Sequence, residues 1–436
     1  MAQPEQKPIW LILSHAFNMD GRAASQTITD KIPFLVEAGI TPHVLSAVTG
    51  RLDQKIKHTQ LLPWGPSGLR FDLRHFLRQR LKDQAGLYRI LSTVSGLLLL
   101  PFILLEKILL GLQSHWSWAL PAFFKGWKLC RSHKINLIYS TGGAYSAHLA
   151  GYWLKKVTGL PWIAEIHDPL VSPNPASPQN RNARLMKKLE GWICREADFV
   201  WWFTEGALRS ASRRHPQVKG KVIMPGANPP VVKAAYERNA HLVFGHFGSL
   251  SATRSLSPFL KALADFFKKQ PDAQHKIRLE IYGSDLKADP ESQKLISLYD
   301  LTENVKVCGR LEFCDKTQLS GREQIMMRMQ QMDCLLLMHG STLECAEYIP
   351  SKVYEYFWAK RPVFGITYQN PQLDQLILER HGYIAATLNP EAILSQIEKI
   401  YGAWPAGQLV SETFYPPIGV ERAVTEIIQS LQNQRI

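Results

Sequence analysis

The sequence has little cysteine and lacks the spacings that would give its cysteines a structural role. It contains six cysteines and no Cys-x2-Cys pair, so neither a zinc ribbon nor a secreted disulfide framework is indicated. No charged segment followed by a long apolar stretch stands near the N-terminus, and we expect no signal peptide. Internal repeats and low-complexity stretches are also lacking. These absences favour a globular protein of a reducing cytoplasm.

The length and composition are those of a globular chain with two domains. A chain of 436 residues corresponds to two domains of roughly 100–200 residues each. Hydrophobic residues make up 45% of it, and the mean hydropathy of −0.14 excludes a polytopic membrane protein. Apolar runs at 8–14 and 41–47, separated by a helical pattern at 26–37, predict strands that alternate with helices. We therefore expect an α/β protein with doubly wound parallel sheets.

A proline- and glycine-rich stretch, residues 224–230, predicts the boundary between the two domains, because clustered proline and glycine continue neither a helix nor a strand. We expect one domain over residues 1–228. Strands and helices alternate again over residues 229–415, which we expect to form the second domain. Residues 416–436 contain a closing amphipathic helix, predicted at 421–432.

The positive charge is concentrated in the first domain. Between Arg51 and Lys134 there are 14 lysines and arginines against four acids, which accounts for +10 of the net charge of +14. Two uncharged runs, 90–105 and 108–124, lie in the same region, and each is shorter than the ~20 residues of a spanning helix. Trp116, Trp118 and Trp127 stand beside basic residues there.

This mixture predicts that a segment at about 86–131 lies on an anionic membrane surface without crossing it. The alternatives are a pair of helices buried in a large core and a single-pass transmembrane helix. Nucleic acid is not the expected partner, because the basic residues flank leucines rather than alternating with stackable aromatic residues. We expect a cytoplasmic protein held peripherally on the inner face of the cell membrane.

The most informative stretch is Glu347–Pro362, which reads E-Y-I-P-S-K-V-Y-E-Y-F-W-A-K-R-P. A proline followed by Ser351 predicts a helix start with a capping serine, and the helix should end near Arg361, just before a proline. Lys352 and Glu355 share a face one turn from the positive helix end. A phosphate can bind at such an end, and a carboxylate can accept hydrogen bonds from sugar hydroxyls. The alternative is an ordinary amphipathic helix with solvated charges.

Glu347 and Glu355 are separated by seven residues, and a Lys-Arg-Pro-Val strand start follows them. This pattern resembles the donor-sugar signature of family 4 glycosyltransferases, whose GT-B fold has two Rossmann-like domains facing a cleft. The resemblance implies that Glu347 contacts the transferred sugar and Glu355 the nucleotide ribose. It also implies that Lys352 and the helix start at Ser351 neutralise the diphosphate.

Other positions of the second domain match the same family. Gly248 follows a predicted strand, and Arg254 stands six positions later, where family members place a basic residue facing the diphosphate. Ser249 replaces the arginine that they often carry after the glycine. Gly283 and Arg310 follow the next two predicted strands and would lie on the donor side. The alternative for Arg254 is a solvated loop charge.

The resemblance is looser in the first domain. His167 and Asp168 follow the predicted strand 162–166, and catalytic side chains of open α/β sheets collect at such strand ends. The resemblance implies that His167 contacts the sugar or the acceptor and that Asp168 lines the acceptor side; a purely structural histidine is the alternative. Where family members have a glycine-rich acceptor loop, this chain has only Gly21 and Arg22.

The resemblance therefore implies a glycosyltransferase that moves a sugar from a nucleotide sugar, with retention, to a lipid-linked or glycan acceptor in cell-surface polysaccharide assembly. Glu347 and His167 are the expected catalytic residues. No Asp-x-Asp motif is present, and we expect no metal or other cofactor. A nucleotide-sugar 2-epimerase of the same fold is one rival reading. The other is a non-catalytic, membrane-recruited protein that binds sugar nucleotides.

Overall fold

The computed structural model describes residues 7–19, 22–81, 84–409 and 416–434. The chain forms two compact units. Unit 1 comprises Met1–Met224 and Val420–Ile436, and unit 2 comprises Pro225–Gly419. Unit 2 is therefore inserted into unit 1.

Unit 1 is built on a parallel sheet of seven strands in the order β3-β2-β1-β4-β5-β6-β7. Its strands are β1 (Ile9–Leu13), β2 (Thr41–Ala47), β3 (Lys57–Leu61), β4 (Ile135–Ser140), β5 (Trp162–Ile166), β6 (Phe199–Trp202) and β7 (Gly220–Val222). Its helices are α1 (Ala23–Thr29), α2 (Ile32–Glu37), α3 (Pro66–Arg80), α4 (Ala85–Leu109), α5 (Ala119–Ser132), α6 (Tyr145–Thr158), α7 (Arg181–Glu196), α8 (Glu205–Arg214) and α15 (Val420–Gln434), with a short 3₁₀ helix η1 (Ser114–Trp118). The strand order reverses between β1 and β4, the place where open α/β sheets bind ligands at their carboxyl ends.

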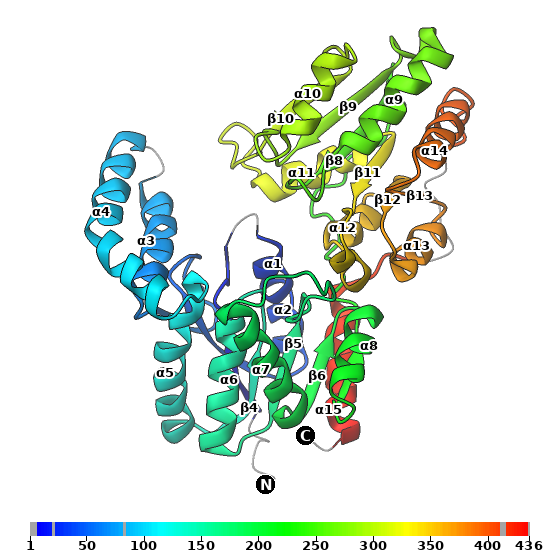
Figure 1. Ribbon diagram of the computed structural model, residues 1–436. Coiled ribbons are helices and arrows are strands. Elements are labelled where there is room, and N and C mark those ends of the chain that lie inside the picture. Colours follow the sequence, from blue (N-terminus) through cyan, green and yellow to red (C-terminus); the bar gives the residue numbers. More distant parts are fainter. Residues whose placement is uncertain (1–6, 20–21, 82–83, 410–415, 435–436) are drawn as a thin grey trace. The chain divides into compact units, whose positions relative to one another are not determined.

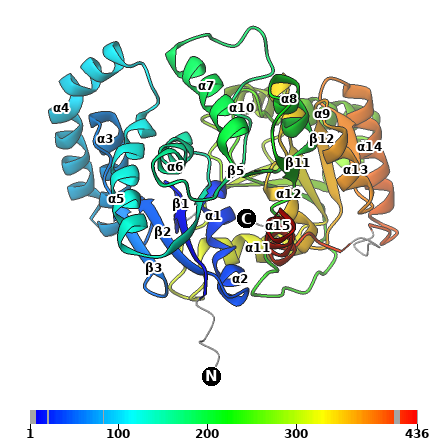
Figure 2. The same cartoon turned by 90° about the horizontal axis from the view of Figure 1, so that it is seen from below.

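Both faces of this sheet are covered, because successive side chains of its strands point to opposite sides. In β1, Leu11 and Leu13 join one core with residues of α5, α6 and α7. Trp10 and Ile12 join a second core, to which α2 and α15 contribute. Figure 2 shows these two helix layers on either side of the strands. The last helix of the chain is thus part of the core of unit 1.

Helices α3 and α4 pack against each other as a hairpin that stands away from the sheet (Figure 1). The backbone N–H of Ser67 donates to Glu106 Oε2 at 2.8 Å, and Trp116 Nε1 donates to Glu106 Oε1 at 2.6 Å. These bonds join the first turn of α3 to the last turns of α4. Glu106 is buried by them, although a lone glutamate in an apolar run would be read as a surface residue.

Our prediction that this apolar run is too short to span a membrane is wrong. The sequence count stopped at charged residues, but α4 continues through Pro101 and the satisfied Glu106 for 25 residues, about 37 Å at 1.5 Å per residue. By length and composition alone, α4 could cross a membrane. Most of its apolar side chains are exposed: Leu87, Ile90, Leu91, Val94, Leu97, Leu98, Leu100, Phe102, Leu104, Leu105, Ile108 and Leu109.

The second uncharged run behaves differently from the first. It breaks at Gly111, which has φ +62°, and continues as η1 and α5. Trp118, Ala119 and Ala122 are buried in the core of unit 1, and Trp118 cannot belong to an interfacial aromatic belt. Of residues 86–131, only α4 and a few side chains such as Trp127 are therefore available to a membrane.

Unit 2 is a parallel sheet of six strands in the order β10-β9-β8-β11-β12-β13, which reverses between β8 and β11. Its strands are β8 (Leu242–Phe247), β9 (Ile277–Tyr282), β10 (Val305–Gly309), β11 (Cys334–Met338), β12 (Val363–Thr367) and β13 (Tyr383–Ala386). Its helices are α9 (Ser257–Lys269), α10 (Pro290–Leu298), α11 (Gly321–Gln331), α12 (Lys352–Trp358), α13 (Pro371–Leu378) and α14 (Pro390–Ala403), with 3₁₀ helices η2 (Pro271–Ala273) and η3 (Leu343–Glu347). The predicted fold class, two Rossmann-like doubly wound domains, is confirmed.

One predicted helix is wrong in its extent. We expected a single helix over 26–37, but α1 ends at Thr29 and α2 begins at Ile32. Pro33 occupies the first turn of α2, where its missing N–H costs nothing. In the interior of a longer helix the same proline would remove a hydrogen bond.

Candidate functional site

The carboxyl ends of the strands of unit 2 are lined by glycines. Gly283 (φ +86°) and Gly309 (φ +68°) have left-handed backbones, which glycine adopts at little cost. The N–H of Gly283 donates to Gly309 O at 2.7 Å, and the N–H of Gly248 donates to Tyr282 O at 2.9 Å. A Cβ on Gly283 would lie 3.3 Å from Gly248 O. Three adjacent strand ends thus present backbone without side chains, which leaves room for a ligand.

Arg254 is held over this edge of unit 2. Its Nη2 lies 3.1 Å from the hydroxyl of Tyr348, and the guanidinium faces that ring at 5.8 Å. Tyr348 in turn donates to His339 O at 2.6 Å, at the end of β11. Burial raises the pKa of Tyr348 to about 12 despite the nearby Arg254, so the phenol stays a neutral partner. Arg254 is therefore a fixed cation at the switch point of the sheet.

Lys352 and Glu355 come together, as their spacing predicts, but they bind each other. Lys352 Nζ forms an ion pair with Glu355 Oε2, and Arg322 Nη2 lies 3.6 Å from Oε1 of the same carboxylate. The carboxylate is buried, whereas the lysine side chain is 31% exposed. Two cations therefore converge on one carboxylate at the start of α12.

The capping role predicted for Ser351 is wrong. Ser351 is the N-cap residue of α12, but it has helical dihedral angles and makes no side-chain cap hydrogen bond. An N-cap residue that accepts from the next turn needs an extended backbone. Because α12 has only seven residues and ends at Trp358 rather than near Arg361, its backbone end is a weak anion site. The charges of Arg254, Lys352 and Arg322 are the stronger feature.

The remaining donor-side residues are less closely grouped. Glu347 is buried at the end of η3, ahead of α12, so the two glutamates of the Glu-x7-Glu pattern stand on different elements. Ser249 and Arg310 are exposed directly after β8 and β10. The structure places both at strand ends, as expected, without bringing them against Lys352 or Glu355.

At the carboxyl end of β5 in unit 1, His167 belongs to a buried polar network. Its Nε2 lies 2.6 Å from Glu165 Oε1 and 3.1 Å from Thr141 Oγ1, and its ring stacks on Phe203 at 4.6 Å. Thr141 donates to Glu165 Oε1 at 2.7 Å. Because Nε2 faces a carboxylate, it carries the proton, and Nδ1 is left as the acceptor nitrogen.

Glu165 is itself held by a buried cation. Lys31 Nζ lies 2.5 Å from Glu165 Oε2, with 1% and 0% of the two side chains exposed, and Tyr139 donates to the same oxygen. Burial acts to raise the pKa of Glu165, but Lys31 and His167 outweigh it and hold that pKa well below its ordinary value. Burial lowers the pKa of Lys31 and raises that of Tyr139 well above its ordinary value. The network fixes an ionised carboxylate beneath His167.

The other acceptor-side residues lie at the same edge of unit 1. Asp168 and Arg22 are exposed, after β5 and at the start of α1. Gly21 lies outside the described residues. The turn after β4 comes close to both neighbours, since a Cβ on Gly142 would lie 3.5 Å from Ser14 Oγ and one on Gly143 would lie 3.6 Å from Ala24 Cβ. The predicted residues of unit 1 thus share one edge of the sheet, around the ends of β1, β4 and β5.

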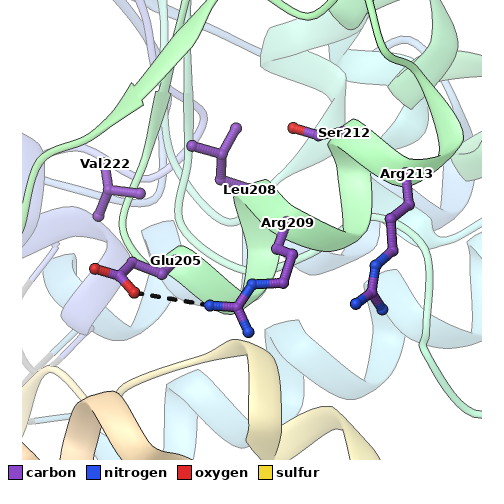
Figure 3. Close-up of a pocket in the computed structure, with 6 residues that line it drawn as sticks. All are labelled: Glu205, Leu208, Arg209, Ser212, Arg213 and Val222. Atoms are coloured by element: carbon purple, nitrogen blue, oxygen red, sulfur yellow. Dashed lines mark ion pairs between the residues drawn. The ribbon is translucent and has the colours of Figure 1, made fainter.

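The largest hollow on unit 1 is not this site. It measures ≈540 Å³ and is lined by residues of α8 with Val222 (Figure 3). Its charged residues Glu205 and Arg209 are 63% and 64% exposed and form a loose ion pair at 3.9 Å. Over the described ranges, no group of three His, Cys, Asp or Glu side chains is placed to hold a metal ion.

Sequence reasoning missed four residues of these sites: Lys31, Glu165, Arg322 and Tyr348. Glu165 carried a signal, because it is the single charge in the otherwise apolar strand Trp-Ile-Ala-Glu-Ile, and a buried charge needs a partner. Lys31 lies 134 positions away in the sequence, and no local pattern marks it as that partner.

No family model matches the sequence. No curated protein sequence matches it either. Solved structures are nevertheless similar over nearly the whole chain. Sucrose-phosphate synthase from Thermosynechococcus elongatus has a TM-score of 0.62 at 14% identity, covering 98% of both chains.

Two further structures differ in their chemistry. WaaG, a glycosyltransferase involved in lipopolysaccharide biosynthesis, has a TM-score of 0.53 at 12% identity, covering 98% of this chain and 95% of its own. A UDP-GlcNAc 2-epimerase from Methanocaldococcus jannaschii has a TM-score of 0.51 at 10% identity, covering 98% and 99%. At these identities the likeness concerns the fold alone, and the fold of this chain is GT-B.

Proposed function

We propose that the protein is a glycosyltransferase that moves a sugar from a nucleoside-diphosphate sugar to a lipid-linked or glycan acceptor. The observation that carries the proposal is the cationic group at the strand ends of unit 2. There Arg254 and the Lys352–Glu355 pair stand beside glycines that leave the backbone open. Sucrose-phosphate synthase and WaaG, which share the fold, support sugar transfer as the reaction class.

The chemistry of sugar transfer requires a stabilised leaving diphosphate and an oriented sugar. Arg254 and Lys352 supply fixed positive charge for the diphosphate, which is most effective where it is preorganised. Glu355 would accept from the ribose, and Glu347 from the transferred sugar. On unit 1, His167 offers Nδ1 to a sugar or acceptor hydroxyl while Glu165 holds its Nε2. We propose that transfer proceeds with retention in cell-surface polysaccharide assembly.

A thermal-shift panel of nucleoside-diphosphate sugars tests the donor. A ligand at 100 times its Kd stabilises a protein by about 2.7 kcal/mol, which is a shift of several degrees at roughly 2–4 °C per kcal/mol. We expect one nucleotide class to give this shift and Lys352→Ala to reduce it. A flat response to every nucleotide sugar would count against the proposal.

We also propose that the hairpin of α3 and α4 holds the protein on the inner face of the cell membrane. Leu98, Phe102 and Ile108 are 69%, 60% and 72% exposed, an apolar surface much larger than soluble monomers usually show. Arg70 lies against Gly96 of α4, so a crossing α4 would carry the arginines of α3 into the hydrocarbon, at a high cost. This favours α4 lying in the interface rather than spanning it.

Vesicle flotation tests this placement. Leu98→Ser with Leu104→Ser should lower binding to anionic vesicles by about a hundredfold, since each buried leucine contributes about 1.5 kcal/mol or more, and should leave the thermal midpoint unchanged. Ile103, only 5% exposed, is the matched control, and Ile103→Ser should lower stability instead. If the exposed pair destabilises the protein as much as Ile103→Ser does, α4 is not a membrane surface.

The epimerase of the same fold makes nucleotide-sugar epimerisation the second candidate. Exposed α4 favours transfer, because an epimerase acts on a soluble nucleotide sugar and has no use for a lipid-facing helix. Incubation with the donor identified by thermal shift separates the readings. An epimerase converts the donor without any acceptor, a transferase releases nucleoside diphosphate only with one, and a non-catalytic binding protein does neither.

A further inference from the structure

Three arginines lie close together at the edge of unit 1 where β1 and β2 end. Arg74 and Arg78 are one turn apart on α3 and are exposed, as is Arg22 at the start of α1. Gln79 Nε2 donates to Thr49 O, which ties this half of α3 to the loop after β2. We call Arg22, Arg74 and Arg78 the arginine cluster.

His75 shows that the three charges act on the same place. Burial lowers the pKa of His75 to about 4, and the charges of Arg22, Arg74, Arg78 and His15, in that order, lower it further. Its Nε2 is buried, with no hydrogen-bond partner in the described part of the chain. Of the titratable groups that face His75, those reported to act on its pKa are all cationic or neutral bases.

Acidic side chains do not neutralise this surface. Asp72 is the one carboxylate in the sequence of α3, and it lies beneath the arginines with no exposed surface, its Oδ1 3.4 Å from His15 Nε2. Among the described residues, Arg22 and Arg74 form no ion pair. The cluster is therefore a concentrated positive surface above a buried Asp72–His15 pair, and such a surface selects an anion.

The cluster adjoins the apolar part of the same hairpin. At the base of α4, Phe102, Leu105, Leu109 and Leu110 line a hollow of ≈320 Å³ together with the start of α3 and Trp116. Its lining is continuous with the exposed apolar residues of α4. One molecule that carries both a phosphate and a long hydrocarbon chain would satisfy both surfaces.

We propose that the arginine cluster binds the phosphate or diphosphate of the lipid-linked acceptor, whose hydrocarbon chain lies along α4. Guanidinium groups bind phosphate oxygens in pairs through charge-assisted hydrogen bonds. The cluster stands at the carboxyl edge of the sheet, as does His167, so a sugar hydroxyl next to that phosphate would lie on the reacting side of unit 1. This assignment rests on the proposed function, of which it names the acceptor class.

Direct binding of geranyl diphosphate, a soluble molecule with both parts, tests the assignment by titration calorimetry. Arg74→Gln with Arg78→Gln should weaken binding at least tenfold, about 1.4 kcal/mol, and far-UV circular dichroism should confirm an unchanged fold. Arg209→Gln with Arg213→Gln is the matched control, since it removes two exposed arginines at the same spacing on α8. Equal loss in both pairs, or in neither, would overturn the assignment.

Two further probes distinguish the sources of the phosphate. Geraniol should bind weakly to every variant, and inorganic pyrophosphate should bind at least tenfold more weakly than geranyl diphosphate. Equal binding of inorganic pyrophosphate overturns the lipid assignment. Loss of phosphatidylglycerol vesicle binding without loss of geranyl diphosphate binding assigns the arginines to bulk headgroups and also overturns it. Since nucleotide binding resides in unit 2, a flat nucleotide panel with arginine-dependent geranyl diphosphate binding would reject the donor proposal alone.

Discussion

Each unit carries a lysine–glutamate pair at the carboxyl edge of its sheet, and the two pairs lie in opposite environments. In unit 1, Lys31 and Glu165 are 1% and 0% exposed and are surrounded by Tyr139 and Trp201. In unit 2, Lys352 is 31% exposed. The first pair has its partners inside the protein and acts by holding His167. The second keeps one side open, as a group that exchanges its partner for a ligand must do.

Lys31→Met should give the largest effect of any substitution at these pairs. Removing one partner of a buried ion pair leaves an uncompensated charge and costs about 3–5 kcal/mol. Urea unfolding should show this loss, and Lys31→Met with Glu165→Gln should recover part of it. Lys352→Met is the matched variant in unit 2, and its cost should stay below about 1 kcal/mol. Equal costs for the two lysines would remove the distinction between the pairs.

Ligand binding should show the reverse order. Lys352→Ala should weaken the nucleotide sugar by about 1.5–3 kcal/mol, the contribution of charge-assisted hydrogen bonds. Isothermal titration checks this.

The two glutamates then divide the donor between them. Glu355→Gln should weaken free nucleotide and nucleotide sugar alike, whereas Glu347→Gln should spare the free nucleotide and lower turnover. If both glutamate variants bind free nucleotide equally, the roles assigned to them are wrong.

The pH dependence of stability should reveal the pair in unit 1. The pKa of Glu165 is lowered in the folded protein from an ordinary value of 4.5, so its contribution to stability is complete above about pH 4.5. Below that pH the unfolded state binds the proton more readily, and stability falls by up to about 1.4 kcal/mol per pH unit for one group. Urea midpoints between pH 3 and 6 measure the slope, and Glu165→Gln should flatten it. An unchanged slope in that variant would show that other carboxylates dominate.

The smallest expected effect is that of Ser351→Ala in unit 2. The side chain of Ser351 makes no cap hydrogen bond, and its loss should cost less than about 0.5 kcal/mol. Ser320, which forms a capping box with Glu323 at the start of α11, is the control, and Ser320→Ala should cost about 1 kcal/mol. A larger cost at Ser351 would mean that the serine does support the open pair next to it.

The fold was largely predictable, because the strands of both sheets are short apolar runs with clear ends. The strands β2, β5, β8 and β12 match the predicted residues throughout, and Pro362 does mark the boundary before β12. The α1–α2 break was not found, because a helical pattern at 26–37 concealed the effect of Pro33. Glu106 was misleading for a related reason, since its charge is satisfied by Ser67 and Trp116, which are distant in the sequence.

The sites were predictable only where they are local. Lys352 and Glu355 are three residues apart on one helix, so their pairing follows from helical geometry. Arg322 and Tyr348 reach the site through the tertiary fold, and so do Lys31 and Tyr139 in unit 1. The role of Ser351 failed because the sequence shows the residue type and not its backbone angles.

The insertion of unit 2 has a consequence for the order in which the protein folds during synthesis. Val424 and Ile427 of α15 belong to the core of unit 1 with Trp10 and Val44, yet they leave the ribosome after all of unit 2. Domains generally fold as units while the chain grows. Unit 2, contiguous from Pro225 to Gly419, can therefore be complete while one face of the sheet of unit 1 is still uncovered. The domain that begins first is finished last, and its open face depends meanwhile on chaperones.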